Sequence, residues 1–162
     1  MIKSPAPRVV GSALVAGQFL LLALIVLLPN GDFWSAASWL VGVATVLCFI
    51  GVTTVVAAAL HLGRGLTAMP LPNQHNELRT TGVYRWVRHP IYSGLIAFSV
   101  GRTILSGNVV TVVLCGALIV LLWFKSHWEE QQLRKRYSAY DDYARTTGRL
   151  VPRLRRSSIS GA

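Results

Sequence analysis

The amino-acid sequence predicts an all-α fold: an integral membrane helical bundle of four transmembrane helices, followed by a C-terminal cytoplasmic amphipathic helix. The first observation is composition, because 52% of the 162 residues are hydrophobic and only 14% are charged. The mean hydropathy of +0.48 is likewise too high for an ordinary soluble domain. The second is patterning, since long apolar runs alternate with blocks that hold nearly all lysines and arginines. Embedding in a membrane accounts for both observations.

The first two apolar runs are uncharged and long enough to cross a hydrocarbon core of roughly 30 Å. Val9 to Leu28 has Gln18 as its only strongly polar residue and ends in a turn, Pro29 to Asp32. A cleavable signal peptide is the alternative, but its apolar region is normally about 7–15 residues long and ends at a small-residue site. We therefore expect a retained first span and a second, somewhat tilted span from Trp34 to Leu60.

Two shorter apolar runs, 91–105 and 109–124, predict a tight helical hairpin joined by the turn 106–108. We expect its first helix to begin at Pro90, because proline suits the first helical turn and pushes the preceding residue out of the helical region. Arg102 lies inside this helix near the turn. We expect it to snorkel to the interface, with pairing inside the bundle as the alternative.

After Phe124, the last span is expected to continue as a polar cytoplasmic helix. Its apolar residues recur at helical spacing and would form one stripe: Leu133, Tyr137, Tyr140 and Ala144. The cationic face of Arg134, Lys135 and Arg136 is interpreted as an anchor to anionic lipid headgroups. The basic, serine-rich residues 153–162 predict a disordered tail.

The distribution of positive charge predicts the orientation in the membrane. Fifteen of the sixteen lysines and arginines lie near the N-terminus, in the connection 61–90 or after Phe124, and the two turns between spans have none. By the positive-inside rule, both termini and the long connection are cytoplasmic, and the protein lies in the cytoplasmic membrane. The expected domains are a two-span hairpin at 1–60, a core with two further spans at 61–152, and the tail.

The net charge of +10 does not indicate a nucleic-acid partner, since the basic blocks lie between apolar runs that no soluble DNA-binding fold would expose. Anionic membrane lipids are the expected counter-charge. Cys48 and Cys115 are isolated within apolar runs and belong to no Cys/His cluster. Neither a disulfide framework nor a metal site is therefore expected.

The stretch from Gly82 to Gly94 concentrates cations, an imidazole, phenols and turn-forming residues directly before an apolar run. A helix beginning at Pro90 directs its free N–H groups and positive dipole end toward Arg88 and His89, which should attract an anion. The alternative is that the arginines and aromatic side chains here only anchor the helix at the membrane surface.

An acidic pair, Glu129 and Glu130, lies about one turn beyond the fourth span. Because only three residues join the last two spans, the hairpin returns this pair to the surface that carries His89. A pocket with both charges suits a zwitterionic ligand. The alternative is a solvated helix face on which Lys125 and Glu129 form an ordinary i,i+4 pair.

The order Gly-Val-Tyr-x-x-x-Arg-His-Pro-x-Tyr-x-Gly, followed one hairpin later by Glu-Glu-x-x-Leu, resembles the isoprenylcysteine carboxyl methyltransferase family and its relatives, the membrane phospholipid methyltransferases. The resemblance extends over about residues 66–152. It implies an S-adenosylmethionine-dependent methyltransferase that needs no metal. The implied partner is a lipophilic small-molecule or lipid-linked acceptor in the membrane, with carboxyl O-methylation as the first expectation.

The same resemblance implies a cofactor site made from residues just before Gly82 (about Asn76 to Arg79), the tyrosine and histidine-proline motifs, and the acidic pair. The candidate residues are Leu78, Arg79, Tyr84, Arg88, His89, Pro90, Ile91, Tyr92, Glu129 and Glu130. Cations and helix N–H groups suit the cofactor's carboxylate, an acid suits its ammonium, and aromatic rings suit its sulfonium. Lys125 matches an arginine that contacts the acceptor carboxylate in the eukaryotic enzymes. It keeps the charge without the bidentate fork.

Three alternatives stay open. The acceptor can be a nitrogen on a phospholipid headgroup. A small four-helix transporter is the alternative from another class; such proteins place a charged residue in a span, and Arg102 is the only candidate for that role. A sterol-type reductase shares part of the pattern and uses a nicotinamide cofactor, although the small size of the chain argues against it.

Overall fold

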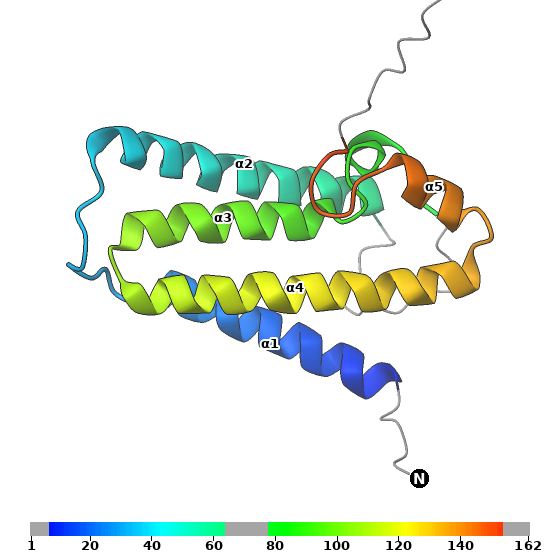
Figure 1. The fold of residues 1–162 in the computed structure, drawn as a ribbon, viewed down its shortest axis with the longest axis horizontal. Coiled ribbons are helices and arrows are strands. Elements are labelled where there is room, and N and C mark those ends of the chain that lie inside the picture. Colours follow the sequence, from blue (N-terminus) through cyan, green and yellow to red (C-terminus); the bar gives the residue numbers. More distant parts are fainter. Residues whose placement is uncertain (1–6, 64–77, 154–162) are drawn as a thin grey trace, which may run out of the picture.

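The computed structural model describes residues 7–63 and 78–153, and these form an all-helical bundle, as predicted (Figure 1). The elements in chain order are α1 (Pro7–Leu27), α2 (Ser38–Leu62), the 3₁₀ turn η2 (Gly82–Arg85), α3 (Pro90–Ser106), α4 (Val109–Arg136) and α5 (Tyr140–Thr146). The predicted tail from residue 154, and residues 76 and 77 of the predicted cofactor segment, lie outside the described residues.

Three of the described helices are long and apolar enough to cross a membrane: Val9–Leu27, Ser38–Leu62 and Val109–Arg136. Their outer faces expose large apolar side chains such as Phe19, Trp39, Phe49 and Val113. A soluble protein rarely exposes so much contiguous apolar surface, which indicates a membrane protein. The remaining long helix, α3, has 17 residues and begins at Pro90, as predicted.

Glycine allows the α2 and α3 backbones to approach each other closely. A Cβ on Gly51 of α2 would lie 2.6 Å from the carbonyl oxygen of Gly94, and one on Gly101 would lie 2.5 Å from that of Ala44. Small residues at such crossings are typical of helix pairs in membranes, where packing replaces the hydrophobic effect as the source of association. On the other side of the bundle, Ile25 of α1 is buried with residues of α4.

The two ends of the bundle differ in character (Figure 1). At one end, the turns after α1 and α3 are joined, since Gly31 N–H donates to the carbonyl of Ser106 at 2.7 Å. Arg102 donates to the carbonyl of Leu28, directly after α1 at this end, at 3.1 Å, so its guanidinium reaches toward the turns and has a partner within the bundle. At the opposite end, the start of α3 and the end of α4 lie beside η2 and α5.

The prediction of one continuous helix after Phe124 is correct only as far as Arg136. Tyr137 has extended backbone angles (φ −120°, ψ 112°) and ends α4, after which α5 begins at Tyr140. The reversal buries Tyr140, which is only 1% exposed. It also lets Arg134 pair with Asp141 at 2.9 Å, so this arginine is not part of an open lipid-anchoring face. Burial of a tyrosine and the new contacts of α5 outweigh the helical periodicity of the segment.

Candidate active site

A glycine turn and a proline build the entrance to α3. Gly82 has a φ of +61°, and a Cβ there would overlap the ring of His61, so this position requires glycine. The η2 turn then sets Tyr84 against α2, where its hydroxyl donates to a backbone carbonyl at 3.4 Å. His89 occupies the N-cap position and Pro90 the first helical position. Tyr84 and His89 are thereby both buried, each 8% exposed.

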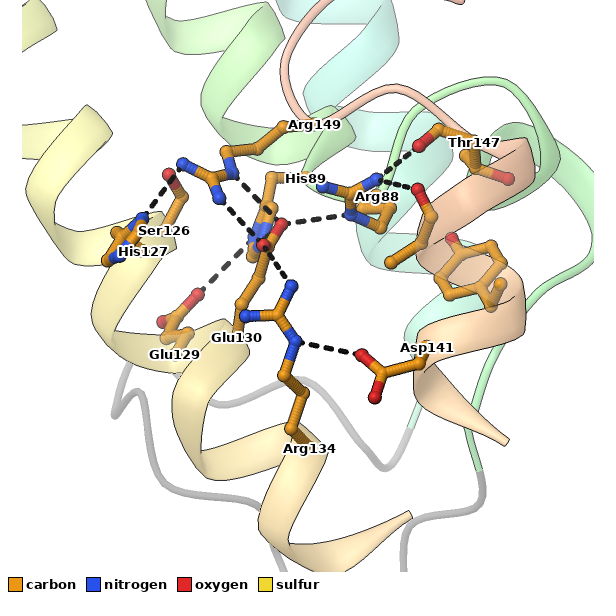
Figure 2. Close-up of polar contacts among 12 residues, drawn as sticks. Arg88, His89, Ser126, His127, Glu129, Glu130, Arg134, Asp141, Thr147 and Arg149 are labelled. Carbon is orange, nitrogen blue, oxygen red and sulfur yellow. Dashed lines mark hydrogen bonds and ion pairs between the residues drawn. The ribbon is translucent and has the colours of Figure 1, made fainter. Parts of the chain in front are cut away.

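Glu130 of α4 is the centre of a buried ion-pair cluster (Figure 2). Arg88 Nε lies 2.9 Å from Glu130 Oε1, and Arg149 donates to both oxygens at 3.1 and 2.9 Å. Arg134 approaches Oε2 at 4.0 Å from the following turn. A buried carboxylate is costly unless it is paired and hydrogen-bonded, and two guanidinium groups meet that need here. Glu130 and Arg88 therefore neutralise each other.

The residues Thr147–Leu150, here called the C-terminal strap, lie along the entrance to α3. The N–H groups of Arg88 and His89 donate to the carbonyls of Gly148 and Arg149 at 2.8 and 3.0 Å. Ser93 Oγ donates to the carbonyl of Leu150 at 2.6 Å. The Arg88 guanidinium also donates to the carbonyl of Thr147. Arg88, the cation that was expected to attract a ligand anion, thus also secures the strap to α4.

Glu129, one residue earlier on α4, belongs to a second cluster with His89 and Tyr92. The Tyr92 hydroxyl donates to Glu129 Oε1 at 2.6 Å, and His89 Nδ1 lies 3.4 Å from Glu129 Oε2. The two rings stack, with centroids 5.3 Å apart and an interplanar angle of 6°. The Glu129 side chain is 15% exposed, whereas that of Glu130 is fully buried. Of the two carboxylates, Glu129 is the one that a ligand can reach.

His89 lies between the two carboxylates. Burial opposes its protonation, but the contacts with Glu129 and Glu130 outweigh burial and raise the pKa of His89 above its ordinary value of 6.5. Its Nε2 is buried 3.4 Å from Glu130 Oε1 and makes no hydrogen bond with the described residues. Burial, and secondarily the charge of Glu129, also raises the pKa of Tyr84 to about 12, so that phenol is neutral at pH 7.

Lys125 lies one turn before Glu129 on α4 and is almost completely buried, at 1% exposed. Its Nζ donates to Oε1 of Gln18 on α1 at 2.7 Å and lies 5.1 Å from the centre of the Tyr92 ring. A cation at this distance over an aromatic ring is stabilised by the ring's electron density. Through Tyr92, the predicted acceptor residue is therefore adjacent to the predicted cofactor cluster.

The other predicted residues flank these clusters. Pro90 is buried and Ile91 half-buried in the first turn of α3. Leu78 is half-buried and Arg79 exposed at the start of the second described segment. Within the described part of the chain, neither residue forms a hydrogen bond or ion pair with Glu129.

Two residues of the assembled site were not predicted. Gln18 is conspicuous as the one strongly polar residue of the first span, but its partner is 107 positions away. Arg149 is one of several C-terminal arginines, and no local pattern distinguishes it from its neighbours.

Comparison with known proteins matches residues 39–140 to a family model described as phospholipid methyltransferase. The chain belongs to this family. The match includes η2, α3 and α4, and hence Arg88, His89, Tyr92 and both glutamates, which confirms the family resemblance predicted from the motifs. Gln18 and the C-terminal strap lie outside the range matched to the phospholipid methyltransferase model.

The curated relatives of this chain have a more specific name than the family. Protein-S-isoprenylcysteine O-methyltransferase A of Arabidopsis thaliana is 31% identical over 119 residues, which are 70% of this chain and 60% of the relative. A probable protein-S-isoprenylcysteine O-methyltransferase of Oryza sativa subsp. indica is 34% identical over 123 residues, 70% of this chain and 62% of the relative. The chain thus spans about three fifths of the length of these relatives.

Proposed function

We propose that this chain is an S-adenosylmethionine-dependent membrane methyltransferase that acts on the carboxyl group of a lipophilic acceptor. The observation that carries the proposal is the junction at Tyr92, whose hydroxyl binds Glu129 and whose ring lies beside Lys125. A carboxylate that can hold a cationic donor and an ammonium that can hold an anionic acceptor are thus adjacent. Membership of a methyltransferase family supports the same reaction class.

The residues present fit the cofactor. Glu129 offers a reachable carboxylate for an ammonium, and the rings of Tyr84 and Tyr92 suit a sulfonium. Protonated His89, with its buried Nε2, and the first-turn amides of Ile91 and Tyr92 are donors for a carboxylate. When bound, S-adenosylmethionine supplies a methyl group on a sulfonium. We propose that Arg88, Glu130 and Arg149 support this site structurally, because both arginines form ion pairs with Glu130.

The chain's own task is to align and desolvate the acceptor. An ionised carboxylate needs no base to become a nucleophile, so no side chain has to remove a proton from it. Lys125 is positioned to hold that carboxylate at the depth of the bundle interior, where water is excluded. The name of the curated relatives makes an S-isoprenylated cysteine the first acceptor to test.

We further propose that α3 is a fourth span and that both chain ends face the cytoplasm of a cytoplasmic-membrane protein. A helix of 17 residues is at the lower limit of about 17–25 residues for crossing a membrane. Its close glycine contacts with α2 support the proposal that the two helices lie at the same depth in the membrane. Fifteen of the sixteen basic residues then lie on one side.

A second candidate is N-methylation of a phospholipid headgroup, which the description of the matched family favours. The buried Lys125 ammonium weighs against it, since a nearby positive charge disfavours a cationic acceptor and product.

The test uses the purified full chain in detergent or nanodiscs. Binding calorimetry should detect S-adenosylmethionine and not NADPH. Methyl transfer from labelled S-adenosylmethionine should then be measured to an amine-blocked S-isoprenylcysteine and, in parallel, to phosphatidylethanolamine. Transfer only to the lipid would select the second candidate. Binding of NADPH without S-adenosylmethionine would overturn both.

A further inference from the structure

Gln18 contributes the one strongly polar side chain of the first span to the interior of the bundle. It is 6% exposed, and its Oε1 accepts a 2.7 Å hydrogen bond from Lys125 Nζ. A polar amide at membrane depth is costly and is usually retained for a function, although a structural link between α1 and α4 would also explain it. Gln18 lies on α1, outside the residues 39–140 that match the family model.

The orientation of the Gln18 amide follows from its partner. A lysine ammonium can only donate, so the amide must present its oxygen to Lys125, and its NH₂ group must point elsewhere. Among the described residues, that NH₂ group makes no hydrogen bond. Because the amide oxygen and nitrogen share one carbon, a second donor lies immediately beside the ammonium.

Two adjacent donors match the two oxygens of a carboxylate. An arginine supplies such a pair from one side chain, whereas a lysine supplies a single point charge. Gln18 and Tyr92 contact the Lys125 ammonium through an uncharged amide and an uncharged ring, so neither of these two contacts neutralises it.

We infer that Gln18 and Lys125 together form a two-donor site for the acceptor carboxylate, in which Lys125 supplies the charge and Gln18 both positions Lys125 and donates the second hydrogen bond. The inference rests on the proposed carboxyl methylation. It assigns to α1, which carries no recognisable motif, a residue that determines acceptor specificity.

The decisive variant is Gln18→Glu. A glutamate still accepts the hydrogen bond from Lys125, so the link between α1 and α4 is retained, but it lacks the NH₂ donor and neutralises the ammonium. We expect the Michaelis constant for an amine-blocked S-isoprenylcysteine to rise about 10- to 100-fold, while the dissociation constant for S-adenosylmethionine changes less than about twofold.

Gln18→Leu, which removes the link as well, should show the same shift together with a lower melting temperature. Gln131→Glu, on the exposed face of α4, is the matched control and should leave both constants unchanged.

A binding readout separates recognition from packing. The wild type should bind the S-isoprenylcysteine carboxylate more tightly than its uncharged carboxamide, and Gln18→Glu should abolish that preference. An unchanged Michaelis constant and preference in Gln18→Glu, with the wild type active on the carboxylate, would overturn the two-donor site alone. A wild type that binds S-adenosylmethionine but does not methylate the carboxylate would instead overturn the proposed function.

Discussion

The hydroxyl of Tyr92 donates a 2.6 Å hydrogen bond to Oε1 of Glu129, and this contact joins the first turn of α3 to α4. The same ring stacks on His89 and lies 5.1 Å from Lys125 Nζ. One side chain therefore touches both the proposed cofactor residues and the proposed acceptor residue. A change on either side of Tyr92 should affect one ligand more than the other, and this is the basis of the first two predictions.

Glu129→Gln should weaken the binding of S-adenosylmethionine about 10- to 100-fold, corresponding to about 1.5–3 kcal/mol for a lost charge-assisted hydrogen bond. Glutamine can still accept from Tyr92, so the helix contact and the melting temperature should change little. Calorimetry in detergent measures the affinity. Asp142→Asn removes an exposed carboxylate on α5 and is the control. Equal affinity in wild type and Glu129→Gln would refute the assigned cofactor site.

Lys125→Gln should raise the Michaelis constant for a carboxylate acceptor more than it changes S-adenosylmethionine affinity, because the acceptor loses the counter-charge that holds it. The new amide can still hydrogen-bond to Gln18, so the bundle is preserved. With an amine acceptor the same variant should be neutral or slightly faster. Steady-state kinetics distinguish the two, with the exposed Lys135→Gln as control. A large loss with an amine acceptor would contradict the role given to Lys125.

The stability of the protein should depend on the protonation of His89. Its pKa is raised in the folded state, so protonated His89 stabilises the fold fully below the ordinary pKa of 6.5, and this contribution is lost as pH rises through the higher folded-state pKa. The melting temperature of the wild type should fall over that range. His89→Gln should flatten this part of the profile, whereas His127→Gln, an exposed histidine, should not. Parallel profiles for wild type and His89→Gln would count against a charged His89.

Arg149→Ala should destabilise the fold by about 3 kcal/mol, because it leaves a buried carboxylate, Glu130, without one of its two close guanidinium partners. It should also loosen the C-terminal strap from α3. Arg153→Ala, which removes only an exposed hydrogen bond to a backbone carbonyl, is the control. Denaturant titration of both variants measures the difference. Similar losses in the two would mean that the Glu130 cluster adds little stability.

Single cysteines at Asn30 and Gln74 should be labelled from opposite sides of the membrane, since Asn30 lies in a turn without lysine or arginine and Gln74 lies in the basic connection. The background replaces Cys48 and Cys115 by alanine. Labelling of both positions by one impermeant reagent added to intact cells would exclude the proposed orientation.

The sequence by itself determined the features that depend on local chemistry. Hydropathy located the apolar helices because a helix at membrane depth must be apolar over about 20 residues. The proline at position 90 set the start of α3 for steric reasons. The meeting of His89 with Glu129 could also be predicted, because a three-residue turn returns the last helix to the level at which the previous one began.

Only the tertiary structure decided which charged groups pair and where α4 ends. The partners of Glu130 are Arg88, 42 positions before it, and Arg149, 19 positions after it. Lys125 is held by Gln18, which is 107 positions away in the sequence. Such pairs form because a buried charge must be satisfied by whatever donor the packing brings near, and no periodicity encodes that choice. Tertiary packing also decides that α4 ends at Arg136. Burial of Tyr140 and the contacts of α5 depend on surfaces that exist only once the bundle has formed.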